Sequence, residues 1–139
     1  MIGVLVVTHG KLAQGFQDSV GLIMGEQPQF DTVGLFEGND FNDFKKSIYD
    51  KVVSLDSGEG VAVLVDLFGA SPYNATAGNI SKLKEEGHEI RLITGVNLPM
   101  LIESLSQRTS SQDLNGFYKT ALTSGKEGIK ELMTELERK

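Results

Sequence analysis

Short, nearly continuous apolar runs alternate along this chain with segments whose apolar residues recur at helical spacing. Runs rich in Val, Ile and Leu are typical of strands buried on both faces of a sheet. Four such strands are predicted, at residues 1–7, 31–36, 61–66 and 89–94. Helical patterns follow, at residues 12–24, 41–56, 71–86, 99–105 and 113–123. The alternation predicts an α/β fold with an open, mostly parallel four-stranded sheet, helices on both faces and right-handed crossovers.

Glycine, serine and proline mark the expected ends of several elements. Gly87 follows the last periodic residue of one helical pattern, and residues 57–60 interrupt another. Ser71 and Pro72 combine an N-cap residue with a residue that suits the first helical position. We therefore expect one helix to run from Ser71 to about residue 86.

The last thirty residues carry a weaker signal. Gly125 and Gly128 interrupt the preceding helical pattern, and propensity favours a further helix over residues 129–136, with a short edge strand as the alternative. No internal repeat, low-complexity tract or interdomain linker is visible. We expect residues 1–139 to form a single domain, because a chain of this length with 40% hydrophobic residues can bury a substantial core.

Composition and charge exclude several kinds of chemistry. Cysteine is absent, which rules out disulfides, thiolate catalysis and cysteine metal sites. Nineteen acidic and thirteen basic residues give a net charge of -6, and no basic stripe is interleaved with aromatic residues, so nucleic acid is not an expected partner. No apolar stretch approaches the length of a membrane span and no signal-peptide pattern is visible, so we expect a soluble, cytoplasmic protein.

Three loops are expected at the carboxyl edge of the sheet, where open α/β proteins place their chemistry: residues 8–10, 66–72 and 94–97. His9 ends the first strand and Asp66 ends the third. A carboxylate that holds one ring nitrogen of a histidine fixes its tautomer and makes the other nitrogen more nucleophilic. An unperturbed imidazole has a pKa of about 6.5, so at neutral pH it is largely the free base and can attack phosphorus.

Ser71 adds a candidate anion site, because the macrodipole and unpaired N–H groups of a helix N-terminus favour a phosphoryl group. Each feature also has a purely structural interpretation. A histidine at a strand end is about as often a hydrogen-bonded structural residue, and Asp66 can be a turn residue. His88 precedes the fourth strand, at the opposite edge of the sheet, and we interpret it as a solvated loop residue.

Three segments form a pattern that is specific as a set: residues 8–10 (THG) after an apolar strand, residues 64–74 (LVDLFGASPYN) and residues 93–101 (ITGVNLPML). In order and spacing they resemble the enzyme IIA component of the mannose family of the bacterial sugar phosphotransferase system. The similarity runs from residue 2 to about residue 133.

The resemblance implies a phosphocarrier. It implies that His9 accepts a phosphoryl group at Nε2 from the phosphohistidine of HPr and passes it to a histidine of enzyme IIB, while Asp66 orients Nδ1. No cofactor and no metal ion are expected. The residues expected to hold the phosphoryl oxygens, together with nearby backbone amides, are Ser71, Thr8, Gly10 and Gly69.

The family also implies a homodimer that exchanges a carboxyl-terminal strand, and residues 125–132 resemble that segment, so we expect a fifth, antiparallel strand there. Enzyme IIB is expected on a separate chain. Membrane contact is expected only indirectly, through the IIC/IID sugar permease. Because both partners are proteins, an apolar rim around His9 is expected. The candidates for this rim are Phe36, Phe68, Leu98 and Met100.

Two departures from the family pattern are visible. Gly69-Ala70 stands where the family often has Gly-Gly, and residues 36–40 differ from the commoner proline-glycine turn. Three alternatives remain open: the related phosphocarrier that serves dihydroxyacetone kinase, a chelatase, and a regulatory flavodoxin-like module. A chelatase needs a second histidine in the pocket, whereas a flavodoxin-like module has no need for a pair such as His9 and Asp66.

Overall fold

The computed structural model describes residues 1–109 and 113–138 of the chain. Its centre is a four-stranded sheet in which each neighbouring pair of strands is parallel. The strands lie in the order β2-β1-β3-β4. Their bounds are Gly3–His9 for β1, Phe30–Leu35 for β2, Val61–Val65 for β3 and Ile90–Ile93 for β4. β1 is therefore an interior strand, and β2 and β4 form the two edges.

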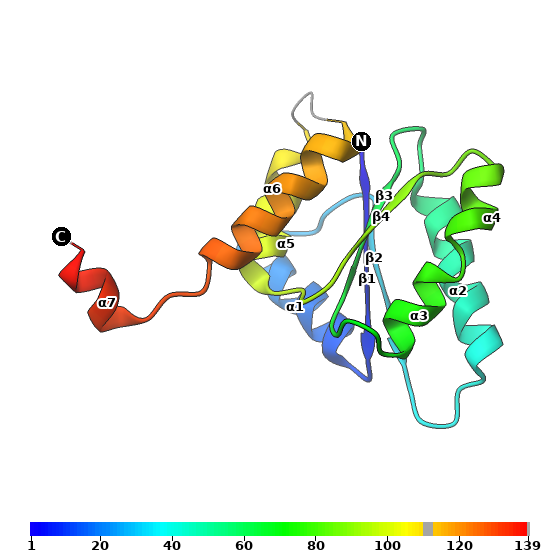
Figure 1. Cartoon of the computed structure of the whole chain (residues 1–139), viewed down its shortest axis with the longest axis horizontal. Coiled ribbons are helices and arrows are strands. Elements are labelled where there is room, and N and C mark those ends of the chain that lie inside the picture. Colours follow the sequence, from blue (N-terminus) through cyan, green and yellow to red (C-terminus); the bar gives the residue numbers. More distant parts are fainter. Residues whose placement is uncertain (110–112, 139) are drawn as a thin grey trace.

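Helices cover both faces of the sheet (Figure 1). One layer consists of α1 (Leu12–Met24), α5 (Leu98–Gln107) and α6 (Leu114–Glu127). The other consists of α2 (Phe41–Leu55), α3 (Ser71–Ala77) and α4 (Ile80–Glu85). The predicted α/β class, with four parallel strands between two helical layers, is confirmed.

The side chains of β1 alternate between two hydrophobic cores. Val4 and Val6 pack in the core that includes residues of α1, α5 and α6, whereas Leu5 and Val7 pack in the core that includes residues of α2. All four side chains are fully buried. Each such burial contributes about 1.5–3 kcal/mol, so both layers hold β1 in place and with it the position of His9.

The single helix predicted over residues 71–86 is wrong, because Gly78 and Asn79 divide it into α3 and α4. The backbone N–H of Asn79 donates to the carbonyl of Thr76, in a tighter turn than an α-helix makes. Its side chain donates to the carbonyl of Lys45 on α2 at 2.9 Å. This tertiary hydrogen bond and the low helix propensity of glycine and asparagine together favour a break in the helix at this point.

The predicted interruption at Gly125 is also wrong, because α6 continues through it to Glu127. A Cβ at Gly125 would lie 2.7 Å from Cε of Met100, so this glycine allows α5 and α6 to approach each other closely. α7 (Leu132–Glu137) follows, and Figure 1 shows it apart from the body of the protein. The helix that propensity favours is present, whereas the exchanged strand involves a second subunit and stays a prediction.

Candidate functional site

His9 and Asp66 meet at the carboxyl edge of the sheet. β1 and β3 are adjacent parallel strands, so the end of one lies beside the end of the other. Nδ1 of His9 lies 2.7 Å from Oδ2 of Asp66, and the backbone N–H of His9 donates to the same oxygen at 2.9 Å. The His9 side chain is 48% exposed and the Asp66 side chain 11%. The ring is thus held on one side and open to solvent on the other.

The Asp66 carboxylate accepts from N–H donors on both oxygens, because Oδ1 accepts the backbone N–H of Leu67 at 2.9 Å. Burial raises the pKa of Asp66, but hydrogen bonds from His9 and Leu67 together outweigh burial and leave the pKa below its ordinary value. The carboxylate is therefore ionised at neutral pH and can only accept, so Nδ1 of His9 carries the proton. The lone pair of the neutral ring is on Nε2, which has no hydrogen-bond partner within the described residues.

Thr8 and Gly10 shape the turn on either side of His9. The Thr8 side chain is fully buried, and its hydroxyl accepts the backbone N–H of Ala13 at 2.8 Å and donates to the carbonyl of His9 at 3.1 Å. Gly10 has a φ of 54°, and its N–H donates to the carbonyl of Leu35 at 2.7 Å. Both donors are already occupied, so these residues fix the β1–α1 turn.

Ser71 opens α3, but the prediction that it is the N-cap is wrong. Ala70 is the N-cap, in extended conformation at a φ of -86°, so alanine fits where the family often has a second glycine. Gly69 has a φ of 80°, and its carbonyl accepts the side chain of Asn74 at 3.0 Å. The Ser71 side chain is exposed, and its hydroxyl makes no hydrogen bond in the described part of the chain.

The loop after β4 packs beside the same edge. The backbone N–H of Val96 donates to the carbonyl of Val65 at 3.1 Å, which holds the loop next to the end of β3. The side chain of Asn97 accepts the N–H of Met100 at 2.9 Å and donates to the carbonyl of Gly125 at 3.0 Å. Asn97 therefore caps α5 and ties it to α6, which is a structural role.

Apolar side chains are exposed on this edge of the protein. Phe68 is 76% exposed and Phe36 44%. Leu67 is 59% exposed and was not among the predicted residues of the apolar rim. The only sequence signal for it was its position between the end of a strand and Phe68. The prediction that Met100 belongs to the exposed apolar rim is wrong, because its side chain is buried in the core. Leu98, another predicted rim residue, is partly buried against the same core.

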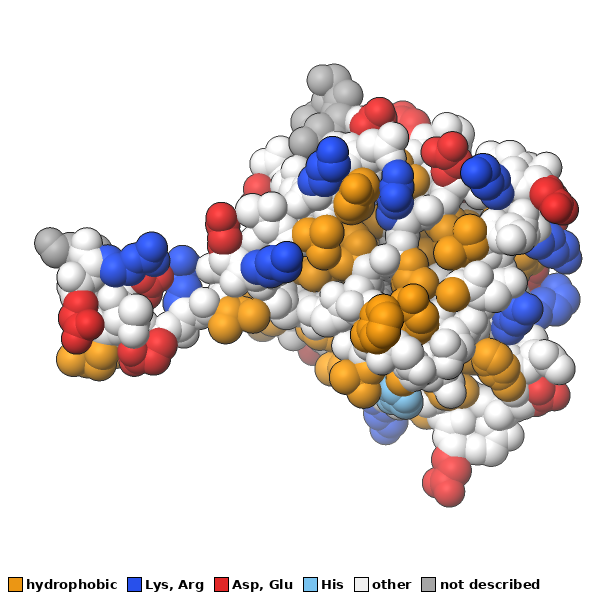
Figure 2. Space-filling model, viewed as in Figure 1, with side chains coloured by type: hydrophobic (Ala, Val, Ile, Leu, Met, Phe, Trp, Pro, Cys, Tyr) orange, Lys and Arg blue, Asp and Glu red, His pale blue; other side chains and the backbone are white. Residues whose placement is uncertain are grey.

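A groove of about 550 Å³ runs along the edge strand β4. β4 lines its floor, and residues of α3 and α6 line its sides, including Tyr73, Tyr118 and Leu122. Figure 2 shows hydrophobic side chains gathered on the face of the molecule over β4. An open edge strand beside an apolar groove is a surface that a second polypeptide can cover.

His88 lies at the amino ends of the strands, at the edge opposite His9, but it is not the solvated loop residue that we expected. Its Nδ1 lies 2.8 Å from Oδ2 of Asp56, and the two side chains are 24% and 4% exposed. Oδ1 of Asp56 accepts the N–H groups of Gly58 and Gly60 at 2.8 and 3.0 Å. This pair ties the turn before β3 to the turn before β4. No local sequence signal identified Asp56 as the partner.

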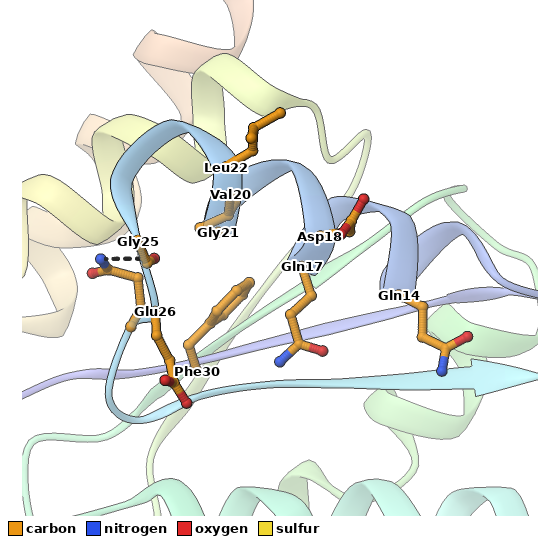
Figure 3. A pocket seen from close by; sticks show the side chains of 10 residues that line it. Gln14, Gln17, Asp18, Val20, Gly21, Leu22, Gly25, Glu26 and Phe30 are labelled. Carbon is orange, nitrogen blue, oxygen red and sulfur yellow. Dashed lines mark hydrogen bonds between the residues drawn. The ribbon is translucent and has the colours of Figure 1, made fainter.

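A separate hollow of about 760 Å³ lies between α1 and the start of β2 (Figure 3). Gln14, Gln17, Asp18 and Phe30 are among its lining residues, which include neither histidine nor lysine. The hollow therefore offers no histidine to accept a phosphoryl group and is distinct from the pair formed by His9 and Asp66.

The fold and the site define an α/β protein with a carboxylate-held, solvent-open histidine at the end of its first strand. The model of the EIIA-man family, described as the PTS system fructose IIA component, matches residues 3–122. The fructose-specific EIIA component of Bacillus subtilis (strain 168) is 33% identical over 108 residues, which are 78% of this chain and 71% of that protein.

Two further relatives support the match. The mannose-specific EIIAB component of Escherichia coli (strain K12) is 29% identical over 131 residues, covering 94% of this chain, and the chain spans only 39% of that protein's length. The crystal structure of EIIA from Streptococcus agalactiae has a TM-score of 0.86 at 28% identity, and the alignment covers 96% of this chain and 99% of that one.

The chain therefore belongs to the EIIA-man family. It is a IIA component of the sugar phosphotransferase system, whose chemistry is phosphoryl transfer. Among residues 1–109 and 113–138, no helix is long and apolar enough to cross a membrane.

Proposed function

We propose that Nε2 of His9 accepts a phosphoryl group from the phosphohistidine of HPr and passes it to a histidine of enzyme IIB during sugar uptake. The observation that carries this proposal is the hydrogen bond between Nδ1 of His9 and Asp66 at 2.7 Å, which leaves the lone pair on the exposed nitrogen. Transfer between two histidines is mainly a matter of positioning and electrostatics, so the proposal invokes no cofactor and no metal ion.

The proposed transfer exchanges one P–N bond for another. The lone pair on Nε2 of His9 attacks the phosphorus, the P–N bond of the donor breaks, and its electron pair returns to the donor ring. His9 then carries both the phosphoryl group and the Nδ1 proton, so its ring is cationic and the Asp66 carboxylate stabilises it. A hydrogen bond of this charged kind is worth about 1.5–3 kcal/mol. The same steps in reverse deliver the group to enzyme IIB.

Ser71 and the backbone at Gly69 are proposed to hold the phosphoryl oxygens. The Ser71 hydroxyl is exposed at the first residue of α3, and Gly69 lies two residues before it. Thr8 and Gly10 are proposed to act indirectly, by shaping the turn that presents His9. Ser71→Ala is expected to slow phosphoryl transfer by about tenfold, the loss of one hydrogen bond to a charged group. The exposed Ser47 on α2 provides the control, since Ser47→Ala is expected to transfer at the wild-type rate.

The first test is incubation with phosphoenolpyruvate, enzyme I and HPr, followed by intact-mass measurement. We expect the wild-type protein to gain one acid-labile phosphoryl group and His9→Gln to gain none. His88→Gln is the matched control, because it also removes a histidine that is paired with an aspartate. No gain on the wild-type protein, with HPr shown to be active, would contradict the phosphocarrier role. A gain on His9→Gln would contradict the choice of acceptor.

The second step is tested by adding enzyme IIB to the isolated phosphoprotein. Loss of the phosphoryl group from this chain and its appearance on enzyme IIB are expected. Transfer to a dihydroxyacetone kinase instead would favour that alternative phosphocarrier role. We place the reaction in the cytoplasm, with membrane contact only through the IIC/IID permease that enzyme IIB serves.

We further propose a homodimer in which the segment after α6 covers β4 of a second subunit. This segment carries exposed apolar side chains, with exposures of 77%, 69%, 59% and 54% for Ile129, Leu132, Met133 and Leu136. β4 offers an open edge and an apolar groove to receive it. Burying both surfaces removes a hydrophobic area that a monomer leaves in water.

Light scattering after size-exclusion chromatography tests the dimer. We expect the full chain to have twice the mass of one chain, and a variant that ends at Gly128 to be monomeric and folded. Replacing Leu22 of α1 by serine is the control, because it removes an even more exposed apolar side chain, at 91%, from another element. A monomeric full chain, or a dimer that survives the truncation, would contradict the proposal.

A further inference from the structure

Away from the proposed phosphoryl-transfer site, three lysines from two helices converge on one groove. The groove has a volume of about 410 Å³ and lies where α2 passes the break between α3 and α4. Lys45 and Lys46 reach it from α2, and Lys82 from α4. None of the residues that line it is acidic, although the chain has a net charge of -6. The charged side chains that line this groove are thus all cationic, in contrast to the net charge of the chain.

Lys45 is half-buried in this groove, which we call the lysine groove, and it lacks a counter-charge. Its Nζ makes no ion pair or hydrogen bond within the described residues, whereas Nζ of Lys46 pairs with Asp50 at 3.0 Å. Charged side chains that are withdrawn from water are normally paired, because desolvation disfavours the isolated charge. An unpaired ammonium in a groove without carboxylates points to an anion as its missing partner.

The end of the Lys45 side chain lies close to Gly78. A Cβ on Gly78 would lie 3.0 Å from Cε and 3.1 Å from Nζ of Lys45, so the end of the lysine occupies the space that a side chain would fill. The buried side chain of Asn79 donates to the carbonyl of Lys45 at 2.9 Å. The break between α3 and α4 therefore ties this part of the chain to the backbone of Lys45 and leaves room at Gly78 for the end of its side chain.

An aromatic ring positions the second ammonium. Nζ of Lys82 lies 4.5 Å from the centroid of the Tyr49 ring, and the hydroxyl of Tyr49 donates to Glu86. A cation–π contact orders an ammonium without neutralising it as a carboxylate does. The charge of Lys82 thus remains available to a ligand in the groove.

We propose that the lysine groove binds a small phosphorylated anion, with Lys45 and Lys82 donating to its phosphoryl oxygens. Its volume lies within the range of small-molecule sites, about 300–1,000 Å³. Lysine binds phosphate groups as a compact point charge with three donors. α3 separates the groove from Ser71 by one helix length, about 10 Å, so this ligand is distinct from the group that His9 is proposed to carry.

Titration of the unphosphorylated protein with inorganic pyrophosphate tests the proposal, at about physiological ionic strength. Backbone amide chemical shifts locate the binding site, and calorimetry gives the affinity. We expect saturable binding with the largest shifts at Lys45, Gly78 and Asn79. Lys45→Met and Lys82→Met keep most of the apolar stem and are each expected to weaken binding by about tenfold.

Two further variants separate a built site from general charge attraction. Lys119→Met on α6 makes the same change in net charge at an exposed position outside the groove and is expected to bind pyrophosphate like the wild-type protein. Gly78→Ala keeps every charge, and its φ of -65° suits alanine, but its Cβ displaces the Lys45 ammonium and is expected to weaken binding.

The proposal is overturned if Lys119→Met weakens binding as much as Lys45→Met does, or if the shifts do not saturate in the groove. It is also overturned if Gly78→Ala, shown to be folded by its thermal unfolding, binds as tightly as the wild-type protein. The titration contains neither HPr nor enzyme I, so its outcome is independent of the test of phosphoryl transfer by His9.

Discussion

Replacing Asp66 by asparagine tests whether a carboxylate must hold His9 in one tautomer. The Asp66 side chain receives three N–H donors: the backbone groups of His9 and Leu67 at 2.9 Å each, and the ring of His9 at 2.7 Å. Asparagine has nearly the same shape but offers one oxygen and one NH₂ group. Whichever way its amide turns, the NH₂ group faces an N–H donor. The substitution therefore isolates the role of the acceptor.

The structure sets the expected size of the effect. If the amide oxygen faces His9, the N–H of Leu67 loses its partner, and because this hydrogen bond is exposed the cost is at most about 0.5–1.5 kcal/mol of stability. In both orientations the negative charge that we propose stabilises the phosphorylated, cationic ring is lost. A charged hydrogen bond of about 1.5–3 kcal/mol corresponds to a transfer rate lower by about tenfold to a hundredfold. His9 is 48% exposed, so solvent screening places the effect toward the lower end.

The rate is measured by rapid-quench transfer from phosphorylated HPr, with urea unfolding of the same variant to establish that it is folded. Asp56→Asn is the matched control, because Asp56 pairs with His88 through the same two atoms. It is expected to lower stability without slowing transfer. A folded Asp66→Asn variant that transfers at the wild-type rate would refute the tautomer argument, and so would equal slowing by Asp56→Asn.

Three further predictions concern stability. Gly34→Ala is expected to cost about 1–3 kcal/mol in urea unfolding, because its Cβ would overlap the carbonyl of Gly10; unchanged stability would contradict this packing. Burial raises the pKa of Asp56, but its hydrogen bonds outweigh burial, so its pKa in the folded protein lies below the ordinary value of about 3.9. The ionised carboxylate therefore stabilises the fold above a pH of about 3.9, and this stabilisation is lost as the pH falls through the lower pKa of the folded state. Acid unfolding followed by circular dichroism should therefore be less steep in Asp56→Asn, and an unchanged profile would contradict that sign. Arg108→Met is expected to cost about 1–3 kcal/mol, because the buried guanidinium donates to the carbonyls of residues 2, 28 and 29; a more stable variant in urea would show that desolvation of the cation dominates.

The sheet and its carboxyl edge could be predicted because the relevant signals are local. A strand buried on both faces is apolar throughout, as in β3, where all five residues are buried. Once the strands are known to be parallel, the rule that their carboxyl ends share one edge brings His9 and Asp66 together. The pairing of these residues thus follows from strand composition and topology, with no need for the details of packing.

The errors have non-local causes. The break between α3 and α4 falls at two residues of low helix propensity, and a hydrogen bond from Asn79 to Lys45, 34 residues away, supports it. In the local sequence Gly125 resembles a helix breaker, yet it lies within α6, where the lack of a side chain lets the helix pack against Met100. The buried position of Met100, which we expected on an exposed rim, depends on packing of the same kind. Neither contact leaves a periodic signal in the sequence. A sequence pattern that specifies one helix or strand therefore does not specify which distant residues that element contacts.

The two histidine–aspartate pairs show that the dyad alone does not define a site. Both join Nδ1 to Oδ2, at 2.7 Å for His9 and 2.8 Å for His88. The pair of His88 closes two turns at the amino ends of the strands, and its histidine is 24% exposed. His9 is twice as exposed at 48%, and it ends an interior strand whose side chains pack into both cores. The proposed role, a nucleophile that meets two protein partners, needs an open nitrogen on a rigid base, and of these two pairs the one at the carboxyl edge provides both.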